Sequence, residues 1–122
     1  MSLLNYFSRK LRTTPSTSYI EYVAYVTNSG YLVAPKADVM KNELGVEVVF
    51  KRTGVGEYLI EAPGVFNEYK KVVPIFNSQK GSPIVSNVFW NDKDSLGVYI
   101  WNLGGQLVDN FFVGNLVIRV YL

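Results

Sequence analysis

Apolar and polar residues alternate along most of this 122-residue chain, from residue 19 to the C-terminus. Glycine and asparagine interrupt the alternation about every eight to twelve residues, a spacing typical of β-sandwiches and β-barrels. We therefore predict an all-β fold, an antiparallel β-sandwich that is jelly-roll-like in its number of strands. The eight expected strands are 19–27, 31–34, 46–53, 57–62, 71–76, 84–91, 96–101 and 117–122.

The first 18 residues follow a different pattern, in which apolar residues recur at helical spacing with basic residues among them. A polar stretch at 13–18 follows, and Pro15 favours extended chain there. This segment is either a frayed terminus or a docking peptide that orders on a partner. We expect an N-terminal anchor and linker at 1–18 and a β-sandwich domain at 19–122. The expected anchoring residues are Leu3, Leu4, Phe7, Arg9, Lys10, Leu11 and Arg12.

The chain contains no histidine and no cysteine, which excludes thiol nucleophiles, Ser-His-Asp triads, disulfides, and zinc sites built from thiolate or imidazole ligands. Asp92 and Asp94 form the one close acidic pair, but Lys93 between them favours a solvated turn over a calcium site. A glycosidase needs two carboxylates at a set separation, and any domain offers candidates. We expect no catalytic residue, cofactor or metal. The formally available carboxylates are Glu21, Glu47, Glu57, Glu61 and Asp109.

The net charge is +2, and the first twelve residues contain three basic residues and no acidic one. Beyond them acids and bases are mixed, unlike the basic stripe of a nucleic-acid binder. Leu3 and Leu4 precede the basic residues, the reverse of the order in a signal peptide. No apolar run approaches the roughly 18 to 20 residues of a membrane span. We expect neither a nucleic-acid partner, nor an export signal, nor a membrane span.

Two expected strands are apolar on both faces. Tyr19, Val23 and Tyr25 lie on one side of 19–27 and Tyr22 on the other, and 117–122 is similar. A single sandwich buries one face of each sheet, and large exposed apolar patches are rare on monomers. The pattern therefore predicts self-association, unless the tyrosines line a solvated face.

The aromatic residues near the C-terminus fall on two different strand faces. Trp90 shares a face with Ile84 and Val88, so we expect it in the core. Tyr99 and Trp101 share the other face of their strand and either belong to the core or contact a partner or a glycan.

Several short motifs lie between residues 45 and 122: GEYLI at 56–60, GVF at 64–66, KV at 71–72, VYI at 98–100, DN at 109–110 and VIRVY at 117–121. Together they resemble the small β-domain that ends many fibre proteins of tailed bacteriophages, including crAss-like phages. With its own basic, amphipathic N-terminus, the chain looks more like a head fibre or capsid decoration protein than like a tail fibre.

The resemblance implies a structural virion protein, made in the host cytoplasm and located on the capsid surface. It implies a homotrimer that binds a phage capsid protein through residues 1–18. The alternative function is a receptor-binding or glycan-binding tail fibre tip module, in which Tyr99 and Trp101 contact a host surface glycan.

Overall fold

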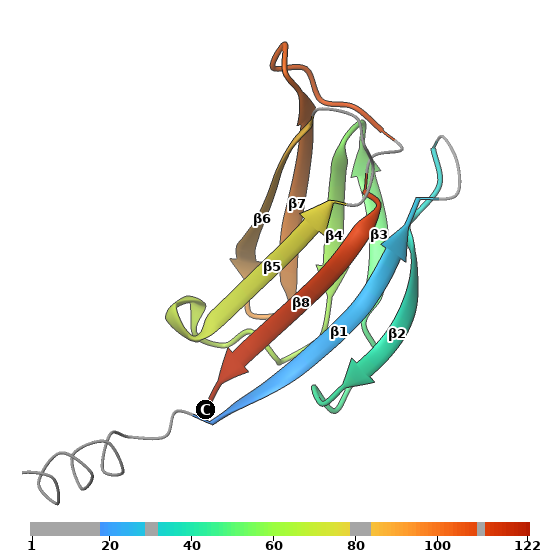
Figure 1. Cartoon of the computed structure of the whole chain (residues 1–122). Coiled ribbons are helices and arrows are strands. Elements are labelled where there is room, and N and C mark those ends of the chain that lie inside the picture. Colours follow the sequence, from blue (N-terminus) through green and yellow to red (C-terminus); the bar gives the residue numbers. More distant parts are fainter. Residues whose placement is uncertain (1–17, 29–31, 79–83, 110–111) are drawn as a thin grey trace, which may run out of the picture.

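The computed structural model describes residues 18–28, 32–78, 84–109 and 112–122, which form two antiparallel sheets packed face to face (Figure 1). The all-β sandwich is therefore confirmed. Within this described part of the chain, no helix is long and apolar enough to cross a membrane. The elements are β1 (Tyr19–Thr27), β2 (Lys36–Asn42), β3 (Val49–Gly54), β4 (Glu57–Glu61), the 3₁₀ turn η1 (Tyr69–Lys71), β5 (Val72–Ser78), β6 (Ile84–Asp92), β7 (Ser95–Asn102) and β8 (Gly114–Tyr121).

Each sheet has four strands. Sheet A has the order β2-β1-β8-β5, and sheet B has the order β3-β4-β7-β6. Strands that follow one another in the chain pair in β1-β2, β3-β4 and β6-β7, while β1-β8, β5-β8 and β4-β7 join distant segments. The strand number matches the jelly-roll-like expectation, whereas this order could not be deduced from counting strands. The edge strands are β2 and β5 in sheet A and β3 and β6 in sheet B.

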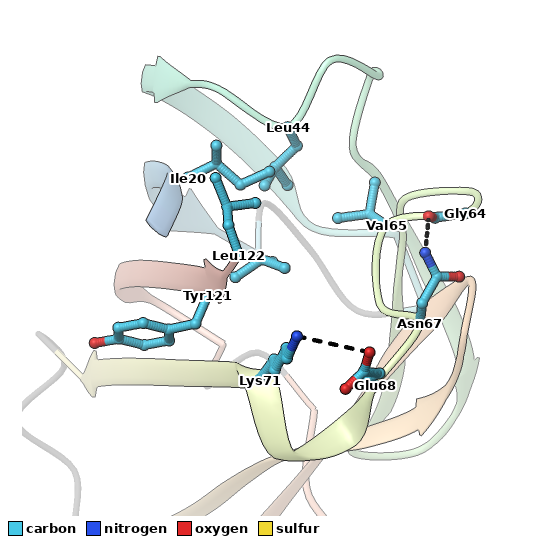
Figure 2. Close-up of a pocket in the computed structure, with 10 residues that line it drawn as sticks. Ile20, Leu44, Gly64, Val65, Asn67, Glu68, Lys71, Tyr121 and Leu122 are labelled. Atoms are coloured by element: carbon cyan, nitrogen blue, oxygen red, sulfur yellow. Dashed lines mark hydrogen bonds and ion pairs between the residues drawn. The ribbon is translucent and has the colours of Figure 1, made fainter. Parts of the chain in front are cut away.

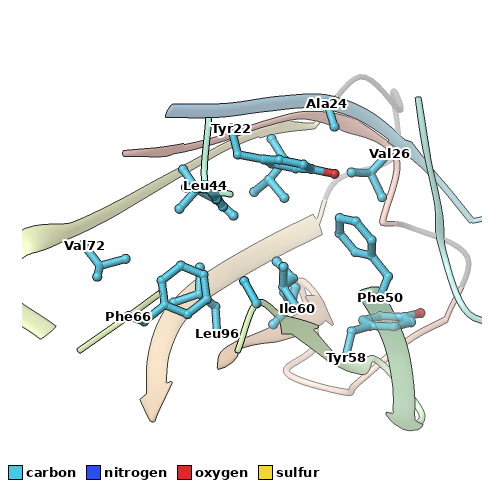
Figure 3. Packing of buried hydrophobic residues seen from close by; sticks show 14 of the residues in the cluster. Tyr22, Ala24, Val26, Leu44, Phe50, Tyr58, Ile60, Phe66, Val72 and Leu96 are labelled. Carbon is cyan, nitrogen blue, oxygen red and sulfur yellow. The ribbon is translucent and has the colours of Figure 1, made fainter. Parts of the chain in front are cut away.

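The core lies between the sheets and follows the alternation of the sequence. Tyr58 and Ile60 on β4 face Tyr22 on β1 across the interior, as Figure 3 shows. Both faces of β1 and β8 are apolar, as expected, but only one face of each strand is fully buried. The residues with no exposed surface are Tyr22, Ala24, Val26, Ile60, Ala62, Phe66, Leu96, Val98, Ile100, Phe112, Leu116 and Ile118.

Phe112 is the aromatic centre of this core. Its ring lies 4.9 Å from that of Phe76 and 5.4 Å from that of Tyr58, both edge to face, and 6.1 Å from that of Phe50. These three partners come from β5, β4 and β3, so one side chain joins the two sheets. Edge-to-face aromatic pairs stabilise beyond the apolar area that they bury.

The second strand lies further along the chain than the sequence predicted. The expected strand at 31–34 is wrong, because residues 32–35 form a turn and irregular chain and Leu32 has a φ of 66°. The strand instead spans Lys36–Asn42, where nearly every residue is exposed. A solvated edge strand has no buried face, so it lacks the alternation by which strands are recognised.

Trp90 is not a core residue, contrary to expectation. Its side chain is 38% exposed, and its indole Nε1 donates a hydrogen bond to the carbonyl of Phe66 at 2.8 Å. The reason is that β6 is an edge strand, whose inward face sheet A covers only in part.

The outward face of sheet A mixes apolar and charged rows. Val23, Val117 and Ile75 align across β1, β8 and β5. In the next row Arg119 Nε donates to Glu21 Oε2 at 2.8 Å. The apolar surface on this face is therefore a single row of side chains, and the Arg119–Glu21 ion pair borders it on one side.

Candidate functional site, an aromatic face on sheet B

Phe89, Tyr99 and Trp101 form a continuous row on the outward face of sheet B, which we call the aromatic face. The ring centroids of Phe89 and Tyr99 are 4.9 Å apart, and those of Tyr99 and Trp101 are 5.6 Å apart. The rings meet at 46° and 67°, so they form a ridge and not a flat plate. Tyr99 remains 37% exposed, while Phe89 and Trp101 are half-buried. The two aromatic residues singled out from the sequence are thus together on the surface.

Phe89 was missed because its position depends on strand register. It lies opposite Gly97 on β7, and its ring covers that glycine. A Cβ atom built on Gly97 would lie 2.3 Å from the Phe89 ring, so only glycine leaves room for it. A glycine inside a strand signals close approach of another group, which is the one sequence clue to this contact.

Polar side chains flank the middle of the aromatic face. Across the strands Tyr99 is aligned with Glu57 on β4 and with Asn87 on β6. Nearby, Lys51 and Glu61 form an ion pair of 2.9 Å on the same face. An apolar ring with a carboxylate and an amide on either side can stack on an apolar surface while it hydrogen-bonds polar edges. This arrangement suits binding to a sugar or to another protein.

A buried ionic network lies at one end of the sandwich. Arg52 Nη2 donates to Asp109 Oδ2 at 2.9 Å, and Arg52 Nε to Oδ1 at 3.3 Å. Asp109 Oδ1 also accepts the Gly56 N–H at 2.9 Å and the Tyr58 hydroxyl at 3.1 Å. Asn28 Nδ2 donates to Tyr58 Oη at 2.8 Å. The network joins β3, β4, the end of β1 and the segment before β8.

The Asp109 carboxylate is stabilised in its charged form. Burial raises the pKa of Asp109, but hydrogen bonds from Arg52, Gly56 and Tyr58 outweigh it and bring the pKa below the usual 3.8. Burial, together with the Asp109 charge, raises the pKa of Tyr58 to about 12. A carboxylate with all these internal donors is a structural anion, and sequence analysis missed this role because 57 residues separate it from Arg52.

Asp92, Asp94 and Glu21 also have internal partners. Asp92 Oδ1 accepts the Asp94 N–H at 2.8 Å, and Asp94 Oδ1 accepts the Gly64 N–H at 2.8 Å, so the acidic pair shapes the β6-β7 turn. Glu21 pairs with Arg119 and Lys41. In the described ranges no three His, Cys, Asp or Glu side chains gather as metal ligands.

An open notch of about 290 Å³ lies at the end of the sandwich where the described chain begins. Figure 2 shows Ile20, Leu44 and Leu122 at its apolar side, and the Lys71–Glu68 ion pair of 3.7 Å at its rim. Leu122 N–H donates to the Ser18 carbonyl at 3.0 Å, which fixes both ends of the described chain beside the notch.

The seven expected anchoring residues lie outside the described residues, so the expected partner contacts of residues 1–17 remain a prediction. No protein-family model, curated protein or solved structure matches this chain.

Proposed function

We propose that this chain is a structural protein of a tailed-phage virion, a head fibre or capsid decoration protein attached through residues 1–18. The observation that carries the proposal is a contact among the motif residues of the resemblance. Asp109 accepts hydrogen bonds from Gly56 and Tyr58, which lie 53 and 51 residues away. The motifs at 56–60 and 109–110 therefore meet in one buried network. This supports a resemblance to the phage fibre domain that extends beyond the turns to the core of the fold.

The closing motif of the resemblance, residues 118–121, also lies in the framework of the fold, on strand β8. β8 is a central strand of sheet A, between β1 and β5. Ile118 and Val120 are buried, while Arg119 pairs with Glu21 and lies 4.9 Å from the Tyr19 ring. The ring of Tyr121 lies 5.2 Å from that of Tyr19, so each residue of the motif has a contact in the framework, which supports the same proposal.

The position of the chain ends suits display from a surface. Ser18 and Leu122 lie at the same end of the sandwich (Figure 1), so an anchor at 1–18 would hold the domain by that end. The outward faces of both sheets then stay available to partners. The proposed role is structural and needs no catalysis, and three of the five candidate carboxylates, Glu21, Glu61 and Asp109, form ion pairs.

Deleting residues 2–14 is expected to abolish binding to capsids that lack this protein, while the β-sheet circular dichroism stays unchanged. The reason is that the anchor supplies the apolar contacts and the core lies within 19–122. Leu4→Asp with Phe7→Asp should have the same effect in a pelleting assay. Asn5→Asp with Ser8→Asp is the matched control, because it adds the same charge without removing an apolar residue. Retained binding of the truncated protein would contradict the proposal.

The aromatic face favours a second function, a receptor-binding or glycan-binding module in which Tyr99 and Trp101 stack on a host surface glycan. Truncating an aromatic residue that anchors an interface costs about 2 kcal/mol or more. The supporting observation is Tyr99, which stays exposed between Glu57 and Asn87.

Tyr99→Ala with Trp101→Ala is therefore expected to lower the affinity for the glycan on an array by at least about tenfold. Tyr69→Ala is the control, since Tyr69 is 60% exposed and lies outside the aromatic face. Equal glycan binding by both variants would exclude this function.

A further inference from the structure

The four edge strands of the sandwich are unequally protected. An edge strand presents unpaired N–H and C=O groups, which proteins shield with charged residues, prolines and bulges. β2 contains Lys36 and Lys41 and a register shift opposite Val23. β3 contains Lys51 and Arg52 and a register shift, and β5 contains Pro74, which has no N–H to donate. Three of the four edges are thus shielded against further pairing.

β6 has none of these features along most of its length. Residues 84–90 read IVSNVFW, with no charged residue and no proline. Pairing with β7 is regular from Ile84 to Trp90, and the register shift comes only after Trp90. Among the described residues β7 is its one strand partner. β-Branched and aromatic residues favour strands, so this free edge is well suited to pair with another strand.

Apolar side chains lie on both sides of this edge. Val85 is 50% exposed on the outward face, and the half-buried Phe89 lies on the same face beyond Asn87. On the other side Trp90 is 38% exposed and its ring lies 6.0 Å from that of Tyr69, itself 60% exposed. A strand added at β6 would therefore be covered by apolar side chains on both faces.

We propose that β6 pairs with β6 of a second copy of this chain, antiparallel and about a two-fold axis. The partner strand must itself be unshielded and apolar, and β6 is the one described edge of that kind. A two-fold interface brings the same strand of both copies together. This pairing joins the two copies of sheet B into one continuous sheet of eight strands.

One register places apolar pairs on both faces. When Val85 lies opposite Phe89 of the second copy, Ile84 lies opposite Trp90, and both pairs are apolar, while Ser86 lies opposite Val88. Asn87 then faces its own counterpart on the axis. Pairs of aromatic and β-branched residues are among the more favourable cross-strand neighbours. The inference does not depend on the virion proposal, and it sets the copy number at two where the resemblance implied three.

Light scattering is expected to give the wild-type chain twice its 13.8 kDa mass at micromolar concentration. Asn87→Lys should give a monomer, because two lysines would face each other on the axis and like charges directly opposite are destabilising. Asn87→Glu should give a monomer for the same reason. An equimolar mixture of the two variants should restore the dimer, since opposite charges then meet. Asn77→Lys, on the exposed face of the β5 edge, is the matched control and should stay dimeric.

Crosslinking tests the register separately. The chain has no cysteine, so Asn87→Cys introduces the only thiol. Oxidation should give a covalent dimer on a non-reducing gel, whereas Lys51→Cys on the β3 edge should not crosslink. A wild-type monomer or trimer, or a mixture of Lys and Glu variants that stays monomeric, would overturn the inference. These results leave capsid binding untouched, so failure here is distinct from failure of the proposed function.

Discussion

Replacing Asp109 with alanine is expected to lower the free energy of unfolding by about 3 kcal/mol, because it removes the buried carboxylate that pairs with the Arg52 guanidinium. The Arg52 and Asp109 side chains are 17% and 2% exposed, so water cannot replace the lost carboxylate fully. Gly56 N–H and the Tyr58 hydroxyl lose the same acceptor. For a domain of this size the melting temperature should fall by roughly 10 °C.

Glu61→Ala is the matched control, since Lys51 and Glu61 form an ion pair of the same 2.9 Å length on the surface. Its loss should cost only about 0–1 kcal/mol. Adding Arg52→Met to Asp109→Ala should recover part of the loss, because replacing both partners of a buried ion pair with apolar residues costs less than removing one of them. Equal melting temperatures for wild type and Asp109→Ala would show that the network does not stabilise the fold.

The contribution of Asp109 should also depend on pH. Its pKa is lower in the folded chain than the value of about 3.9 in an unfolded one. The carboxylate therefore stabilises the fold fully above that unfolded value, and this contribution is lost as the pH falls through the folded pKa. The difference in unfolding free energy between wild type and Asp109→Ala should be largest near neutral pH and should narrow in acid.

Phe112→Ala is expected to cost about 3–5 kcal/mol, the range for removing a large aromatic side chain from a core. Phe112 has no exposed surface, and its ring contacts come from three strands in both sheets. The loss should appear in urea unfolding as a lower midpoint with an unchanged slope.

Tyr69→Ala provides the comparison for Phe112→Ala. Tyr69 is also aromatic, but it is 60% exposed, so its removal should change stability by no more than about 0.5 kcal/mol. If Phe112→Ala were as stable as Tyr69→Ala, Phe112 would not be the residue that joins the two sheets.

The sequence predicted those strands that have one buried face. The bounds of β1 agree with the expected 19–27, and β4 lies within 57–62, because the buried Tyr58 and Ile60 alternate with outward-facing residues. β2 could not be found in this way, since it is exposed along its length. Trp90 was misplaced because the alternation gives the face of a strand but not whether that strand lies at the edge of its sheet.

The residues of the candidate sites could be predicted where they share one strand, but not where they meet only through the pairing of strands. Tyr99 and Trp101 share a face by alternation within one strand, so sequence alone could pair them. Phe89 joins them only through the pairing of β6 with β7, and Arg52 meets Asp109 only through the complete fold. Contacts between distant strands depend on register and topology, which periodicity does not encode.

Cryo-electron microscopy of phage particles purified from cells that produce this protein tests the central claim most directly. The proposal predicts density for the eight-stranded sandwich outside the capsid shell, with the end that holds Ser18 and Leu122 towards the shell and residues 1–18 in contact with it. Density for the sandwich at the tip of a tail fibre, or no copy of it on the particle, would contradict the claim.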